Sequence, residues 1–179
     1  MENAKNSDTI KVADWMTETV LAVEIYDSIS VARQLMAKHR VNQLPVIENE
    51  RLMGIVTDRD IRDAYPTSML IGCTKEIDKF AESYTVEEVM THDVFTVEPE
   101  TPLATAVALL RHHRIGSLPV VKAKQLVGII TRSDILDFVL SGAGIKVARG
   151  RKKARKKMPP AKRSKRSKAL SNRRTTKIL

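Results

Sequence analysis

The sequence has few of the residues that several protein classes require. It contains one cysteine, Cys73, which excludes an intrachain disulfide and a cysteine-based metal cage. Aromatic residues make up only 4% of the chain, so we expect an aliphatic core. The longest run without a charged residue, Ala64 to Thr74, has 11 residues, too few for the ~20 of a transmembrane helix. The first residues lack the apolar segment of a secretory signal, and we therefore expect a cytoplasmic protein with no transmembrane segment.

Acidic side chains are absent from the C-terminal part of the chain. Residues 146–179 hold 16 Lys or Arg and no Asp or Glu, so the remaining 145 residues hold 31 − 16 = 15 basic side chains against all 21 acidic ones. The protein is thus an acidic body of net charge −6 joined to a tail of +16. A tail of this composition cannot bury a core, and we expect it to be disordered alone.

The tail leaves three interpretations open. Phosphate neutralisation would attach it to DNA or RNA, with affinity falling steeply as salt rises. An anionic membrane surface is a second partner of the same charge, although no amphipathic anchor accompanies the basic residues. The third interpretation is a solvated tail that only aids solubility. Because the tail contains no aromatic residue, sequence-specific recognition of single strands is not expected.

The rest of the chain contains an internal repeat. A shift of 74 residues aligns 12–65 with 86–139 without a gap, and 20 of the 54 pairs are identical. The matching segments are Met16-Thr17 with Met90-Thr91, Leu44-Pro45-Val46 with Leu118-Pro119-Val120, and Gly54–Ile61 with Gly128–Ile135. Gap-free identity over a whole unit indicates a duplication and a pseudo-symmetric fold.

Each copy has the same pattern of predicted elements. Short strands at Val20–Val23 and Val94–Val97 lead to helices for which Asp27 and Thr101 are the predicted N-caps. Two β-branched strands and a second helix follow, and Thr57 and Thr131 stand where these second helices begin. We expect an α/β (α+β) fold of tandem β-α-β-β-α modules forming a pseudo-twofold pair.

The repeat sets the expected domain boundaries. They are an N-terminal arm (1–11), the first module (12–65), a connector with a helical turn near Glu76–Glu82 (66–85), the second module (86–140) and the basic tail (141–179).

The two copies together resemble a pair of CBS domains, and specifically a stand-alone two-module protein of the acetoin-utilisation-regulator type. The resemblance rests on the Met-Thr that opens each copy, the Leu-Pro-Val strand and the Gly-Ile-(Val/Ile)-Thr-x-x-Asp-Ile segment, and it covers about residues 12–140. It implies a regulator, often a homodimer, that binds AMP, ADP, ATP or S-adenosylmethionine between its modules.

The resemblance also implies which residues line the two clefts. One, here called the Asp134 cleft, would use Thr17, Leu21, Val41, Asn42, Gln43, Thr131, Arg132 and Asp134. The other, the Asp60 cleft, would use Thr57, Arg59, Asp60, Thr91, Phe95, Ile115, Gly116 and Ser117. In each set the Asp would bind ribose, and Gln43 or Ser117 would approach the phosphates.

Residue chemistry supports this assignment. A Thr-x-x-Asp segment at a strand-to-helix turn places a hydroxyl and a carboxylate where unpaired N–H groups favour phosphate. The alternative is an ordinary helix cap. Asp58 adds negative charge to the Asp60 cleft and Arg132 adds positive charge to the Asp134 cleft. We therefore expect the Asp134 cleft to be the better polyphosphate site.

The sequence offers little support for catalysis. His39, His112 and His113 stand at helix ends without the spaced carboxylates of a metal motif, which favours capping or packing. There is also no glycine-rich phosphate loop followed by Lys, as NTP hydrolysis would need. We expect a protein that is not an enzyme and requires no cofactor or metal. A scaffold that binds nucleic acid through its tail is the alternative function.

Overall fold

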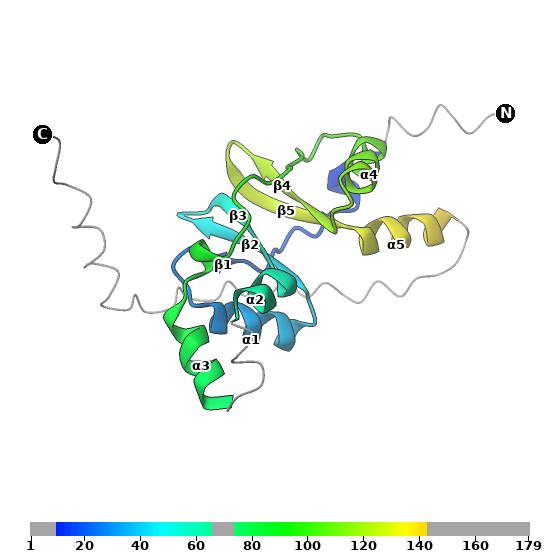
Figure 1. Ribbon diagram of the computed structural model, residues 1–179. Helices are drawn as coiled ribbons and strands as arrows, with labels where there is room; N and C mark the ends of the chain where they lie inside the picture. Colours follow the sequence, from blue (N-terminus) through cyan, green and yellow to red (C-terminus); the bar gives the residue numbers. More distant parts are fainter. Residues whose placement is uncertain (1–9, 66–73, 143–179) are drawn as a thin grey trace, which may run out of the picture.

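The computed structural model describes residues 10–65 and 74–142, so nearly all of the predicted arm and tail lie outside the described residues. One mixed five-stranded sheet has the strand order β1-β2-β3-β5-β4 (Figure 1).

The first module contains β1 (Val23–Glu24), α1 (Ile29–His39), β2 (Gln43–Glu48), β3 (Arg51–Thr57) and α2 (Asp58–Ala64). The second contains α4 (Leu103–His112), β4 (Ser117–Lys122), β5 (Gln125–Thr131) and α5 (Arg132–Gly142). Between them lies α3 (Thr74–Ser83), which extends the predicted turn, and short 3-10 helices open the modules at Val12–Asp14 and Val86–Glu88. The predicted α+β fold class is confirmed.

Two hairpins form most of the sheet. β2 pairs antiparallel with β3, and β4 pairs antiparallel with β5 in the equivalent register. The turns contain Asn49 and Glu50 in one module and Ala123 and Lys124 in the other, all four with φ between 51° and 66°. Positive φ at both central residues is typical of the type I′ turn, whose twist suits a two-residue hairpin. The hairpins meet where Arg51 of β3 pairs with Gln125 of β5, which joins the modules edge to edge.

The predicted N-caps of the first helices are wrong by one residue. The side chain of Ser28 caps α1 by accepting a hydrogen bond from the Val31 N–H, and Pro102 occupies the cap position of α4. The predicted caps instead close the preceding turn. The Asp27 carboxylate accepts from the Glu24 N–H at 3.1 Å, and the Thr101 hydroxyl accepts from the Glu98 N–H at 3.0 Å.

The predicted first strands are also longer than the observed ones. β1 has two residues, with Val23 paired to Val46 in parallel, and the second module keeps a single bridge from Val97 to Val120. Residues 19–21 line a cavity instead of extending the sheet.

The opening segment of each module packs on the core of the other. Val12 is fully buried in the second module's core, and Trp15 packs edge-on against Phe138 of α5 at 5.1 Å. In the same way, Val86 and Met90 belong to the core of the first module. The copies that the sequence repeat defines are therefore interleaved in space.

The second helices end differently in the two modules. α2 stops at Ala64, and Tyr65 is extended in front of Pro66, as expected for a residue that precedes proline. The second copy has Leu140 where the first has Pro66, and α5 continues to Gly142. Tyr65 is buried against Phe80 of α3, which also packs on α1.

Candidate functional site

The Thr-x-x-Asp segments have the same geometry in both modules. The Asp60 carboxylate accepts hydrogen bonds from the Thr57 N–H at 2.8 Å and the Thr57 hydroxyl at 2.7 Å, while the Asp60 N–H donates to that hydroxyl oxygen at 3.3 Å. Asp134 and Thr131 repeat these three distances. Each pair is thus a helix cap as well as a candidate binding group. Asp134 is the more buried carboxylate, with 7% of its surface exposed.

A cavity of about 610 Å³ lies between the modules, at the beginnings of α2 and α5. This volume is within the usual range for sites that bind small molecules. The eight residues predicted for the Asp134 cleft all line it: Thr17, Leu21, Val41, Asn42, Gln43, Thr131, Arg132 and Asp134. Segments distant in the sequence therefore converge as the resemblance implied, although their role in binding stays a prediction.

The residues predicted for the Asp60 cleft are divided. Thr57, Arg59 and Gly116 line the same cavity as the first set, and the other five do not. Phe95 is exposed and stacks on the His113 ring at a centroid distance of 3.9 Å. Asp60, Thr91 and Ile115 stand outside the cavity lining, as does the buried Ser117.

Ser117 differs from its counterpart in the first module. Its hydroxyl is buried and has no hydrogen-bond partner among the described residues. The counterpart, Gln43, lines the cavity, and its amide group lies 3.3 Å from where a Cβ on Gly116 would stand. A polar side chain thus faces the cavity from the first module, whereas the second module buries its equivalent.

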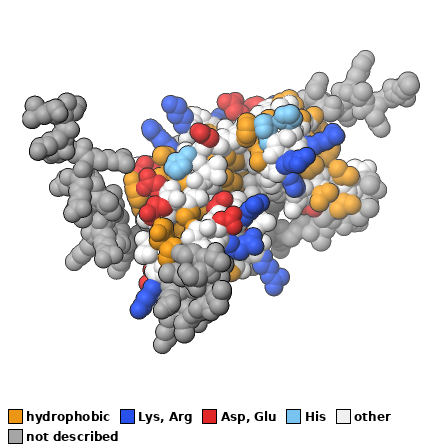
Figure 2. All heavy atoms as spheres, in the orientation of Figure 1, with side chains coloured by type: hydrophobic (Ala, Val, Ile, Leu, Met, Phe, Trp, Pro, Cys, Tyr) orange, Lys and Arg blue, Asp and Glu red, His pale blue; other side chains and the backbone are white. Residues whose placement is uncertain are grey.

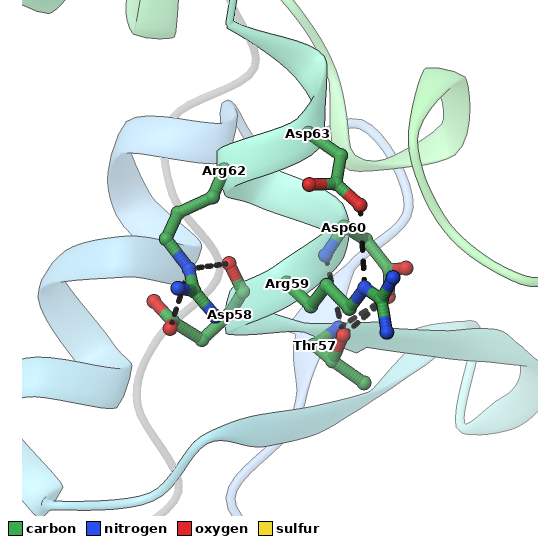
Figure 3. A network of polar contacts seen from close by, with 6 residues as sticks. All are labelled: Thr57, Asp58, Arg59, Asp60, Arg62 and Asp63. Carbon is green, nitrogen blue, oxygen red and sulfur yellow. Dashed lines mark hydrogen bonds and ion pairs between the residues drawn. The ribbon is translucent and has the colours of Figure 1, made fainter. Parts of the chain in front are cut away.

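Four arginines line the cavity, and three of them form an ion pair or a hydrogen bond with a neighbouring residue. On α2, Arg62 contacts the Asp58 carboxylate at 3.0 Å and Arg59 contacts Asp63 at 3.4 Å (Figure 3). Arg132 donates from its Nε to the Ile115 carbonyl at 3.0 Å. These contacts are exposed, so the guanidinium groups can exchange partners at small cost. Asp58, whose negative charge was predicted for the Asp60 cleft, lines the same cavity as Asp134, and its pair with Arg62 removes part of the repulsion that its carboxylate alone would give.

Arg40 is the fourth arginine and was not among the predicted site residues. It ends α1 in a left-handed conformation with φ 53°, and its guanidinium makes no hydrogen bond or ion pair within the described residues. The sequence places it among basic residues at a helix end, where a capping role explains the charge. Its position directly before Val41 and Asn42, which were predicted site residues, is the feature of the sequence that could have identified Arg40 as a residue of the cavity.

The histidines lie away from the cavity lining. His113 contacts Phe95 and the ring of His112, and the described residues contain no group of three or more potential metal ligands. No described helix is long and apolar enough to span a membrane.

Solved structures with similar folds include a protein of acetoin utilization and CBS-domain proteins with bound adenosine ligands. An acetoin utilization protein (AcuB) of Vibrio cholerae is 32% identical, with a TM-score of 0.64 over 75% of this chain and 93% of that one. CBSX2 in complex with AMP is 31% identical, with a TM-score of 0.62 over 74% and 98% of the two chains. The CBS pair of MJ0100, in complex with 5′-methylthioadenosine and S-adenosylmethionine, is 26% identical, with a TM-score of 0.59 over 73% and 99%.

Sequence relatives include stand-alone proteins and enzymes. The CBS domain-containing protein YhcV of Bacillus subtilis is 34% identical over 69% of this chain and 81% of its own length. Homoserine O-acetyltransferase of Methanococcoides burtonii is 38% identical over 69% of this chain, but the match spans only 23% of that enzyme.

The model of the CBS domain family matches this chain twice, at residues 12–67 and 86–141. These matches coincide with the repeat and together span more than half of the sequence. The chain belongs to the CBS domain family and carries two such domains as a pair.

Proposed function

We propose that this protein is a non-catalytic regulator that binds an adenine nucleotide or S-adenosylmethionine in the cavity between its modules. The observation that carries the proposal is the convergence on one cavity of all eight residues of the Asp134 cleft. Apolar side chains such as Leu21 and Val41 suit the faces of an adenine ring, and polar groups at Asp134 and Thr131 suit ribose and phosphate.

The charges of the cavity favour a phosphorylated ligand. Arg40 and Arg132 are arginines of the lining with no carboxylate partner among the described residues, and guanidinium groups bind phosphate oxygens in a bidentate manner. The positive dipole ends of α2 and α5 also face the cavity, although the first and third N–H groups of each helix are already bonded, to Asn42 and Thr57 or to Gly116 and Thr131. We therefore expect AMP, ADP or ATP to bind more tightly than S-adenosylmethionine, whose sulfonium is cationic. The complexes of CBSX2 with AMP and of MJ0100 with S-adenosylmethionine support an adenosine ligand of either kind.

Isothermal titration calorimetry of the full chain with AMP, ATP and S-adenosylmethionine tests the proposal. Saturable binding of at least one phosphorylated nucleotide is expected, with weaker binding of S-adenosylmethionine. Absence of binding by all three would contradict nucleotide sensing and leave the body as a scaffold.

The proposal also includes the way in which ligand binding would regulate another protein. Ligand binding would shift the packing of the interleaved modules, or of two chains in a homodimer, and so alter a partner protein in the cytoplasm. Bound ligand and dimer contact then change each other's affinity by the same factor, because linkage is reciprocal.

We propose attachment to DNA or RNA as a second function, located in residues 146–179. The segment holds 16 basic side chains and no acidic one, a density typical of phosphate-neutralising tails. Truncation after Gly144 is expected to abolish retention on duplex DNA and RNA, and binding by the full chain should weaken steeply as salt rises. Retention that survives truncation would reject the tail as the binding segment.

A further inference from the structure

An exposed aromatic ring lies at the C-terminal end of α4. The Phe95 ring stacks on the His113 ring, with centroids 3.9 Å apart and planes inclined by 24°. His112 meets His113 edge-on at 4.8 Å, which holds the imidazole from the side. Phe95 is nevertheless 47% exposed, so His113 covers one face of its ring and much of the remainder meets solvent. A ring held in this way can stack on a further planar group.

The stack lies beside arginines that have no partner. Arg111 and Arg114 directly precede and follow the two histidines; both are exposed, and their guanidinium groups make no ion pair or hydrogen bond within the described residues. Figure 2 shows histidine side chains next to a group of Lys and Arg side chains over α4, at the upper right. Basic residues at a helix end also complement the helix dipole, so their charge by itself does not indicate a ligand. The exposed ring next to them is an independent observation.

The equivalent residues of the first module face elsewhere. Leu21 and Arg40, the counterparts of Phe95 and Arg114 in the repeat, both line the cavity between the modules. Neither Phe95 nor Arg114 lines that cavity. The second module therefore presents an aromatic and basic surface outside the cavity, and the aromatic ring in it replaces a leucine of the first module.

We propose that the Phe95–His113 stack binds an unpaired base of single-stranded nucleic acid, while Arg111 and Arg114 contact the neighbouring phosphates. The inference rests on attachment to nucleic acid, the second proposed function, and adds base contact by the body of the protein. The tail cannot supply such a contact because it contains no aromatic residue. Stacking on a ring tolerates any base, so a preference for single strands is expected and a preference for one sequence is not.

Acidic side chains determine on which side the phosphates lie. Asp93 and Glu98, both exposed, belong to the segment that carries Phe95. The end of α4, in contrast, presents four consecutive Arg or His side chains at residues 111–114. The sugar-phosphate backbone should therefore follow the end of α4, with a base turned toward Phe95. Guanidinium groups next to a stacked base also add cation–π attraction.

Fluorescence anisotropy of the full chain tests the proposal with a labelled oligothymidine and a labelled abasic strand of the same length. The tail neutralises phosphates in both strands, so the ratio of the two dissociation constants isolates base stacking. We expect the wild type to prefer oligothymidine roughly tenfold, and Phe95→Leu, which copies the first module, to remove this preference without changing abasic binding. Phe95→Tyr should retain the preference. Tyr26→Leu is the matched control, since it removes an aromatic side chain that is 49% exposed elsewhere, and it should also retain the preference.

Arg111→Gln provides a second variant, expected to weaken binding of both strands alike and to reduce the salt dependence. A wild type that binds both strands equally would overturn the proposal and leave attachment through the tail intact. A preference that survives Phe95→Leu would also reject it, because the base contact would then lie elsewhere. If Phe95→Leu weakens ATP as strongly as oligothymidine, the ring belongs to a nucleotide site and the proposal fails.

Discussion

The helices that follow Thr57 and Thr131 begin with the same cap but present different surfaces. The cap distances agree to a tenth of an ångström in the two modules. Beyond the cap, α2 carries paired charges such as Asp58–Arg62, whereas α5 begins with Arg132 and continues with an apolar stripe. Duplication has thus kept the backbone interactions and allowed the ligand-facing and outward-facing side chains to diverge. Substitutions at matched positions of the two modules should therefore have unequal effects.

Reversal of the charge at Arg132 should have the largest effect, which is a loss of ATP affinity. Arg132→Asp installs the type of residue found at Asp58 and replaces attraction for phosphate by repulsion. We expect ATP affinity to fall roughly 100-fold, because charge-assisted hydrogen bonds are worth about 1.5–3 kcal/mol. Calorimetry with adenosine is the control and should show little change. If adenosine and ATP weaken alike, Arg132 does not act through phosphate.

Gly54 of β3 and Gly128 of β5, which occupy equivalent positions in the repeat, should respond unequally to substitution by alanine. A Cβ on Gly54 would meet the Thr91 carbonyl oxygen at 2.5 Å and the Met90 sulfur at 2.8 Å, whereas one on Gly128 would meet the flexible Met16 side chain at 2.6 Å. The Thr91 carbonyl cannot move freely because it accepts a hydrogen bond from the Ile55 N–H.

We expect Gly54→Ala to cost about 2 kcal/mol of unfolding free energy and Gly128→Ala clearly less, within the usual range for overpacking. Urea unfolding of both variants measures the difference. Equal costs would show that the Met16 side chain is held as rigidly as the Thr91 backbone.

The hairpin turns offer a smaller comparison. Asn49 and Ala123 share a φ of 51°, a left-handed conformation that asparagine tolerates better than alanine. We expect Ala123→Asn to stabilise the protein by roughly 0.5–1 kcal/mol and Asn49→Ala to destabilise it by a similar amount. Thermal and urea unfolding should show opposite signs for the two exchanges, and a common sign would count against the type I′ turns.

Asp27 and Thr101 close equivalent turns in the two modules, but only the Asp27 side chain is titratable. Burial raises the pKa of the Asp27 carboxyl above its ordinary value of 3.8, opposed by the hydrogen bond from the Glu24 N–H. A raised carboxyl pKa means that the folded state binds the proton more tightly, so this contribution to stability is lost as the pH rises from 3.8 through the raised pKa.

Asp27→Thr, which copies the second module, should remove that pH dependence. Urea midpoints measured across this range should converge at low pH and favour the variant at higher pH. A wild-type advantage that grows with pH would show that the Asp27 hydrogen bond outweighs its burial.

The secondary-structure elements of this fold could be predicted from the sequence more readily than the contacts between them. The register of the repeat located both hairpins and the caps at Thr57 and Thr131, because strand periodicity and cap chemistry are local. Ser28 and Pro102 were missed as caps because Asp27 and Thr101, equally suitable residues, are used by the preceding turn.

Other features depend on long-range packing. Met16 and Met90 stand at equivalent positions in the alignment, which does not reveal that each packs on the opposite module. Arg40 lines the cavity whereas Arg114, its counterpart in the repeat, does not, although both are left-handed with φ of 53° and 55°, so neither the residue type nor the local backbone predicts the difference. Site residues that belong to the repeated motif could be predicted from the sequence. Site residues that long-range packing brings to the cavity could not.

The central claim is that the Asp134 cleft, and not the Asp60 cleft, is the principal nucleotide site. Asp134→Ala and Asp60→Ala both remove the cap hydrogen bonds to the threonine, at a cost of about 1 kcal/mol, and the cost should be higher at Asp134, which is the more buried; urea unfolding of each variant measures that cost by itself. Their effect on ATP affinity, measured by titration calorimetry, therefore separates binding from folding. We predict a loss of roughly tenfold or more for Asp134→Ala and little change for Asp60→Ala. Equal losses in the two variants would contradict the account.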